Sequence, residues 1–427
     1  MHTGHPAPAT TPMLTARHRP APGRTNEPAA TGRHRRPGTT GPRRKPAAEP
    51  APVLAESATM TDGTDGLRAR VRRTIGDLVD SGREAGVQVA AYRHGRLIID
   101  ETAGTADSTT GRPLTAGTPI FSVSTGKGLT STVVHVLAEA GRLDYDLRIA
   151  DVWPEFGRHG KHTVTLRHVL THTAGVPDLP ADTTPADFTD WDAMCALIAD
   201  AVPRWAPGER IAYHAWTYGW LVGEVVRRVT GRRISTVLAE DVAAPLGVPE
   251  ELFFGVPEAD LPRLATLEDH GLADLMAFAS AHLPHFDAVA PPAVRPDAAI
   301  GSRPDVLRAD VPAVGTLTAR AAARLYAALI GDVDGVRLIS ADRLRQVSAV
   351  AVRGVEWVFG QETAFGLGYA VDDDGSFGTA GSGGSLAYAY PELGLTVAAT
   401  RNRLGANDGD PMEGLRTLIR DMVRATG

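Results

Sequence analysis

The chain has a single cysteine, Cys195, among its 427 residues and contains no apolar run long enough to cross a bilayer. One cysteine excludes a disulfide within the chain, so Cys195 is expected to be a buried or half-buried apolar side chain. The net charge of −6 is too small to indicate a nucleic-acid or membrane partner. The first residues also lack the continuous apolar segment of a secretory signal. We therefore expect a soluble, cytoplasmic protein.

Lysine is also scarce, because 41 of the 44 basic side chains are arginine and the lysines are only Lys45, Lys127 and Lys161. A buried ammonium loses its proton readily, whereas arginine stays charged at any accessible pH. Lys127 follows Ser124 by three residues. A lysine at this place in an arginine-rich chain indicates an amine that acts as a base, with Ser124 as the nucleophile.

This Ser-x-x-Lys segment lies where a strand is expected to lead into a helix. Residues 118–121 favour an extended strand, and residues 129–140 have a helical apolar pattern that Gly141 ends. Ser124 then opens the helix, and because positions i and i+3 share a face, Lys127 can reach the serine hydroxyl. On its own the tetrapeptide more often means an N-capping serine beside a surface lysine, so the interpretation depends on the rest of the chain.

Three further segments accompany the motif: Leu170–Pro177, Trp205–Gly231, which runs from a Pro-Gly turn into a helix, and the glycine-rich Phe377–Ser385. Each is weak alone. Together, and in this order, they resemble the serine β-lactamase superfamily, in its branch of class C-like (family VIII) esterases, D-aminopeptidases and acyltransferases. The resemblance runs from about Leu67 to the C-terminus.

The resemblance implies a role for each matching residue. Ser124 would be the acylated nucleophile, Lys127 its base and Tyr213 the group that carries a proton to the leaving group. The backbone N–H groups of Ser124 and Ser382 would form the oxyanion hole. Further substrate-binding positions would be His214, Thr379, Gly381 and Gly383. Without the resemblance, Tyr213 is better interpreted as a core aromatic residue and the glycines as a loop or bulge.

Two departures from the family pattern bear on the substrate. Tyr213 is followed by His214 and Ala215 where β-lactamases have Tyr-x-Asn, and Thr379 stands where they have a lysine. The missing amide would orient an amide-bearing acyl group, and the missing cation would meet the carboxylate of a β-lactam. Both departures favour neutral esters over β-lactams. The candidates to replace the missing cation are Arg401 and Arg403.

The chain is expected to have two parts. Residues 1–58 carry nine basic and three acidic side chains with many Pro, Thr, Ala and Gly, which is typical of a disordered extension. We therefore predict a basic extension over residues 1–60 and one hydrolase domain over residues 61–427. Strands at both ends of this domain, with a helical lobe at roughly residues 128–300, predict an α+β fold whose antiparallel sheet is formed from both chain ends.

A metal centre is not favoured. His168 and His172 are four residues apart, but Val169 stands where a zinc protease has glutamate, and no third ligand is evident. We expect a serine hydrolase that needs no cofactor and acts on a small-molecule ester or acyl substrate, most simply as an esterase. The alternatives are an acyltransferase with the same residues and a penicillin-recognising protein that binds without turnover.

Overall fold

The computed structural model describes residues 54–405 and 410–426, with side chains from residue 64 onward. The extension expected over residues 1–60 lies outside this part of the chain except for its last seven residues. These belong to the first helix, α1 (Leu54–Asp80), which continues into the domain.

A nine-stranded sheet is built from both ends of the domain, as expected. Its strand order is β3-β2-β1-β13-β12-β11-β10-β9-β8. The N-terminal strands are β1 (Gly86–Arg93), β2 (Arg96–Asp107) and β3 (Arg112–Pro113). The C-terminal strands are β8 (Val352–Val355), β9 (Glu362–Phe365), β10 (Ala370–Val371), β11 (Phe377–Ala380), β12 (Leu386–Tyr390) and β13 (Leu395–Arg401). All neighbours are antiparallel, and β1 joins the two groups by pairing with β13 from Val87↔Arg401 to Arg93↔Leu395. The α+β fold is therefore confirmed.

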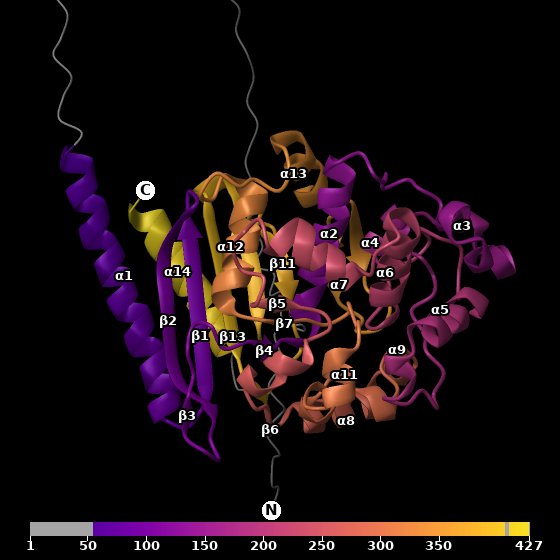
Figure 1. Ribbon diagram of the computed structural model, residues 1–427, viewed down its shortest axis with the longest axis horizontal. Coiled ribbons are helices and arrows are strands. Elements are labelled where there is room, and N and C mark those ends of the chain that lie inside the picture. Colours follow the sequence, from indigo (N-terminus) through magenta and orange to yellow (C-terminus); the bar gives the residue numbers. More distant parts are fainter. Residues whose placement is uncertain (1–53, 406–409, 427) are drawn as a thin grey trace, which may run out of the picture.

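Helices cover both faces of this sheet (Figure 1). Side chains of α1 and α14 (Pro411–Thr426) pack on one face, against Val87, Val89 and Ala91 of β1. The alternate residues Ala90 and Tyr92 face the larger core, which contains α2 (Lys127–Glu139) and α12 (Ala319–Ile330). Because both of its faces are covered, β1 is buried at every position except Arg93.

The remaining helices form the lobe on the other side of α2 and the segment that returns to the sheet. They are α3 (Ile149–Val152), α4 (Leu166–Leu170), α5 (Trp191–Asp200), α6 (Thr217–Thr230), α7 (Ile234–Val237), α8 (Leu272–His282), α9 (Phe286–Val289), α10 (Ala298–Gly301), α11 (Pro304–Arg308) and α13 (Ala341–Ser348). Short strands pair in two small sheets: β4 (Ile120–Phe121), β7 (Thr316–Leu317) and β5 (Leu252–Phe253), and β6 (Glu268–His270) with β14 (Arg403–Gly405). The strand expected before Ser124 is thus β4, outside the main sheet.

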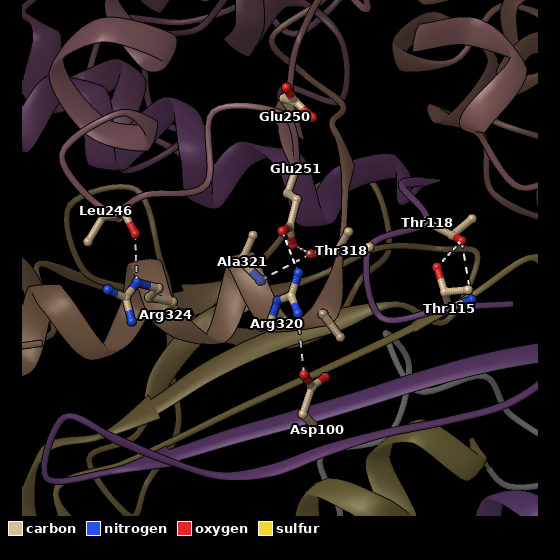
Figure 2. Close-up of polar contacts among 12 residues, drawn as sticks. Asp100, Thr115, Thr118, Leu246, Glu250, Glu251, Thr318, Arg320, Ala321 and Arg324 are labelled. Atoms are coloured by element: carbon tan, nitrogen blue, oxygen red, sulfur yellow. Dashed lines mark hydrogen bonds and ion pairs between the residues drawn. The ribbon is translucent and has the colours of Figure 1, made fainter. Parts of the chain in front are cut away.

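Polar contacts join the helical lobe to α12 and the sheet (Figure 2). Arg320 of α12 donates to Glu251 at 2.5 Å and lies 3.6 Å from Asp100 of β2. One turn further along α12, Arg324 donates to the carbonyl of Leu246 at 2.7 Å. These contacts fix the position of the lobe relative to the sheet, and therefore the width of the space between them.

Candidate active site

Ser124 lies in a tight 3₁₀ turn, Val123–Gly126, that leads directly into α2. Val123 has a φ of 47°, which is strained for a β-branched residue. The turn is held in place because Ser122 N donates to Gly315 O at 2.8 Å. Ser124 itself lines the large cavity next to the sheet. The strained turn thus presents the serine to the cavity at the start of the helix.

The side chain of Lys127 is buried, and its amine lies within hydrogen-bond distance of three oxygen atoms. Its Nζ lies 3.1 Å from Ser124 Oγ, 2.7 Å from Ala215 O and 3.0 Å from Ala313 O. The contacts that the structure describes for this Nζ include no carboxylate, and burial lowers the pKa of Lys127 to about 7. A neutral amine has two N–H groups, which the two carbonyls occupy, so its lone pair faces Ser124 Oγ. Lys127 is therefore oriented to accept the serine proton.

Tyr213 lies on the other side of the serine. Its side chain is hydrogen-bonded to Ser124, and its ring lies beneath Lys127, with Nζ 4.9 Å from the ring centroid. Burial and the nearby charge of Glu356 raise the pKa of Tyr213 well above its ordinary value, although the bond to Ser124 lowers it. The phenol therefore keeps its proton at a pH where a large part of Lys127 has lost its own.

The end of β11 closes against the serine turn. A side chain on Gly381 would place its Cβ 3.2 Å from Ser124 N and 2.5 Å from Ser122 O, so only glycine fits this approach. Ser382 follows and lines the cavity with Ser124. Ser124 N lies in the first turn of its helix, where a backbone N–H has no partner within the helix, and the turn and loop bonds of the described chain include none from Ser382 N. The approach thus leaves two backbone N–H groups for a substrate oxygen.

The cavity has a volume of about 1040 Å³, and one wall is apolar. This wall starts beside Tyr213, where Phe359 has its ring centroid 6.2 Å away, and continues to Phe286, 6.4 Å beyond Phe359. Helices α8 and α9 supply most of its remaining side chains, namely Leu275, Met276, Ala279, Leu283, Val289 and Ala290. The sequence interpretation missed this wall, although the apolar run in residues 272–279 could have indicated it.

Comparisons with known proteins agree with this geometry. The family model described as Beta-lactamase matches residues 71–420. The chain belongs to the beta-lactamase family. It is 34% identical to Esterase/beta-lactamase LipL of Mycobacterium tuberculosis over 357 residues, 79% of this chain and 81% of that protein.

Solved structures of this family share the fold. A family VIII carboxylesterase superposes with a TM-score of 0.75 at 30% identity, over 84% of this chain and 98% of that one. EstA from Arthrobacter nitroguajacolicus Rue61a superposes with a TM-score of 0.73 at 26% identity, over 83% and 96%. This chain is therefore a serine hydrolase of the β-lactamase fold. Within its described residues, no helix is long and apolar enough to cross a membrane.

In this β-lactamase-fold chain, His214 does not lie at the cavity. Its side chain is fully buried, and Nδ1 donates to Ala212 O at 2.6 Å while Nε2 accepts from Val176 N at 3.3 Å. Both ring nitrogens are thus engaged with the backbone. The structure therefore does not bring His214 to the cavity with Ser124, because the residue after Tyr213 points to the opposite side of an extended segment.

Thr379 and Gly383 are likewise displaced from the expected site. Thr379 Oγ1 donates to Thr125 O at 3.0 Å and lies 3.0 Å from the hydroxyl of Tyr326, so it faces α2 and α12. A Cβ on Gly383 would lie 2.8 Å from Leu404, inside the packed end of the sheet. Of the four substrate-binding positions expected from the motif, only Gly381 lines the cavity.

The two arginines considered as substitutes for the missing cation are already engaged. Arg401 is buried, and it pairs with Glu84 at 2.7 Å and donates to Gly383 O and Gly405 O. Arg403 pairs with Glu268 at 2.6 Å. Neither arginine is available to meet a substrate carboxylate.

The two histidines tested as metal ligands have separate structural roles. His168 interacts through Nδ1 with Thr165, the cap of α4. His172 packs its ring against Tyr213 at 4.7 Å between centroids, and its Nδ1 accepts from His214 N at 3.1 Å. Residues 64–405 and 410–426 include no group of three or more His, Cys, Asp or Glu arranged to hold a metal ion.

Proposed function

We propose that this protein is an esterase that acts on neutral acyl esters through an acyl-enzyme on Ser124. The observation that carries the proposal is the Lys127 amine, 3.1 Å from Ser124 Oγ and held between two backbone carbonyls. The names of two relatives support an ester substrate, namely LipL and Esterase EstB of Burkholderia gladioli, which is 28% identical over 202 residues. The latter match covers half of EstB, so it supports the reaction class only.

The acylation step follows from the positions of three side chains. Lys127 takes the proton of Ser124 as Oγ attacks the ester carbonyl, and the N–H groups of Ser124 and Ser382 stabilise the oxyanion. When the intermediate collapses, the carbon–oxygen bond of the ester breaks and Tyr213 gives its proton to the departing alcohol. Lys127 then returns its proton to Tyr213. In deacylation, water takes the place of the alcohol: it loses a proton as it attacks the acyl carbon, and Ser124 Oγ departs with a proton, which releases the acid.

The substrate preference rests on the walls of the cavity. The apolar wall of α8 and α9 favours uncharged groups, because burying an unpaired charge there is costly. Ala215 offers no side-chain amide, and Thr379 faces away, so the two groups that would recognise a β-lactam in relatives have no equivalent here. Neutral esters therefore fit the site better than β-lactams do.

A chromogenic comparison tests this preference. We expect kcat/KM for a short-chain nitrophenyl ester to exceed that for a chromogenic cephalosporin by about 100-fold, because the cephalosporin carboxylate loses its hydration without gaining an unpaired cation. The arginines other than Arg401 that line the cavity are each paired with an aspartate, namely Arg353 with Asp373, Arg416 with Asp372, and Arg420 and Arg424 with Asp374. Equal or faster cephalosporin turnover would contradict the preference. It would direct attention to the paired arginines that line the cavity, among them Arg353, which lies 3.2 Å from Asp373.

The pH dependence of acylation tests the base. Since the pKa of Lys127 is about 7 and only its neutral form accepts the serine proton, kcat/KM for a neutral ester should rise with pH through about 7 and then level off. The measurement is kcat/KM between pH 5 and 9 with an ester that does not ionise. A profile that is flat below pH 7 would rule out a neutral lysine as the base.

Acyl transfer is the second candidate, with the same residues. The cavity of about 1040 Å³ is large enough to hold an alcohol or amine beside the acyl group. Intact-protein mass spectrometry and product analysis with added alcohols or amines distinguish the candidates, because a transferase gives the new ester or amide in preference to the acid. A binding protein would instead keep the acyl group on Ser124 without turnover.

A further inference from the structure

Glu356 is a buried acid beside the site that the acylation steps above do not use. It lies in the loop between β8 and β9 and is 4% exposed. One carboxylate oxygen accepts from Tyr213 N at 2.5 Å, and the other accepts from Val358 N at 3.0 Å and Phe359 N at 2.7 Å. The partners described for this carboxylate are thus three backbone N–H groups. Burying a carboxylate is costly, so a group held in this way calls for an explanation.

The contacts of Glu356 complete a set that holds the backbone of residues 211–214 from both sides. On one side, His172 accepts from Ala212 N through its carbonyl at 2.9 Å and from His214 N through its Nδ1 at 3.1 Å. On the opposite side, Trp357 N donates to Ile211 O at 2.9 Å. Tyr213 N is the next backbone group on this side, and it donates to the Glu356 carboxylate. The carboxylate therefore takes the place that a strand carbonyl would have in a sheet.

The same carboxylate also shapes the cavity wall next to Tyr213. Its bond to Phe359 N places the Phe359 ring 6.2 Å from the Tyr213 ring, and His172 packs on Tyr213 at 4.7 Å. The phenol thus has little freedom to move away from Ser124. The negative charge of Glu356 additionally raises the pKa of Tyr213, which keeps the phenol protonated.

We propose that Glu356 is the positioning residue for Tyr213, holding its backbone so that the phenol reaches the leaving oxygen of the ester. This inference rests on the proposed esterase reaction. Glu356 touches neither Ser124 nor the substrate, and it acts only through Tyr213. Its loss should therefore impair proton donation to the leaving group more than any other step.

Two esters of one acid, butyrate, separate this step from the others. A para-nitrophenolate departs without a proton at neutral pH, whereas an ethoxide needs one. In Glu356→Gln, one acceptor oxygen is replaced by an N–H₂ group that faces backbone donors. We expect kcat/KM to fall about 100-fold for ethyl butyrate, within the range of general acid catalysis, and less than about tenfold for para-nitrophenyl butyrate.

Matched variants accompany this measurement. Tyr213→Phe should show the same discrimination between the two esters, and adding Glu356→Gln to it should cause little further loss, because both changes remove one function. Glu356→Asp keeps two acceptor oxygens on a side chain that is one methylene shorter, so it should show a smaller loss, and that loss should again fall on ethyl butyrate. Glu209→Gln, an exposed change four residues before Tyr213, should leave both rates unchanged.

An equal loss on both esters in folded Glu356→Gln, judged by its melting temperature, would overturn the proposal and leave Glu356 a purely structural group. Full additivity with Tyr213→Phe would also overturn it. If Glu356→Gln does not fold, the ratio of the two rates in Glu356→Asp decides, and an unchanged ratio with lower rates counts against the proposal. Absence of ester turnover in the unmodified protein would instead refute the proposed function.

Discussion

Replacing Ser124 with alanine is expected to lower ester hydrolysis by about 10⁴-fold or more, because no other group can form the acyl-enzyme. The same change should abolish the covalent adduct of a fluorophosphonate probe. Nitrophenyl ester hydrolysis and the intact mass of the probe-treated protein measure the two effects.

Ser122 provides the control for this experiment. It lies in the same segment, but its Oγ donates to Ile120 O at 2.9 Å and does not face Lys127. Ser122→Ala should still gain one probe adduct. If hydrolysis persists in Ser124→Ala, or if the adduct moves to another residue, the nucleophile has been assigned wrongly.

Lys127→Arg should be nearly as damaging as Ser124→Ala, although it keeps the positive charge. A guanidinium stays protonated and cannot accept the serine proton. Because the two side chains work as a unit, the loss in kcat/KM should also be about 10⁴-fold, and the double variant should be little worse than either single one. Steady-state kinetics with a nitrophenyl ester check both expectations.

The chain offers a matched control in its other buried lysine. Lys161 is fully buried outside the site, and its Nζ donates to the carbonyls of Ala199 and Ala201. Arginine can also donate to carbonyls, so Lys161→Arg should keep most of the turnover even where it lowers the melting temperature. If Lys127→Arg retains more than about a tenth of the activity, the assignment of the base is wrong, because a lost general base costs at least 10²-fold.

The parts of the fold that follow local patterns were predictable from the sequence. The helix expected after Ser124 is α2. The residue types at His94-Gly95 favour a tight turn, and this turn joins β1 to β2 with both residues at positive φ. Turn residues at Pro391 to Gly394 likewise join β12 to β13. In each case a few neighbouring residues set the period or the turn, so no distant contact is needed to specify it.

The side chains around the site were less predictable because their roles depend on distant partners. Glu356 is one acid in an irregular loop, and its partner Tyr213 lies 143 residues earlier. Arg401 and Glu84 are 317 residues apart, so a strand-end arginine that looks available in sequence is already paired. Thr379 shows a different limit: a motif places a residue on β11, but it does not say which face the side chain takes.

The pairing of β1 with β13 has a consequence for synthesis of the chain. Val87 can pair with Arg401 of β13 only when almost the whole domain has left the ribosome. Until then β1 has an exposed edge, although the segment that packs against Ser124 at Gly381 has already been made. We therefore expect folding to be late and slow, since contacts so distant in sequence carry a high loop-closure cost. A nascent chain released before β13 would contain both Ser124 and Ser382 but not the strand that joins β12 to β1, and it would depend on chaperones to keep the open sheet edges from aggregating.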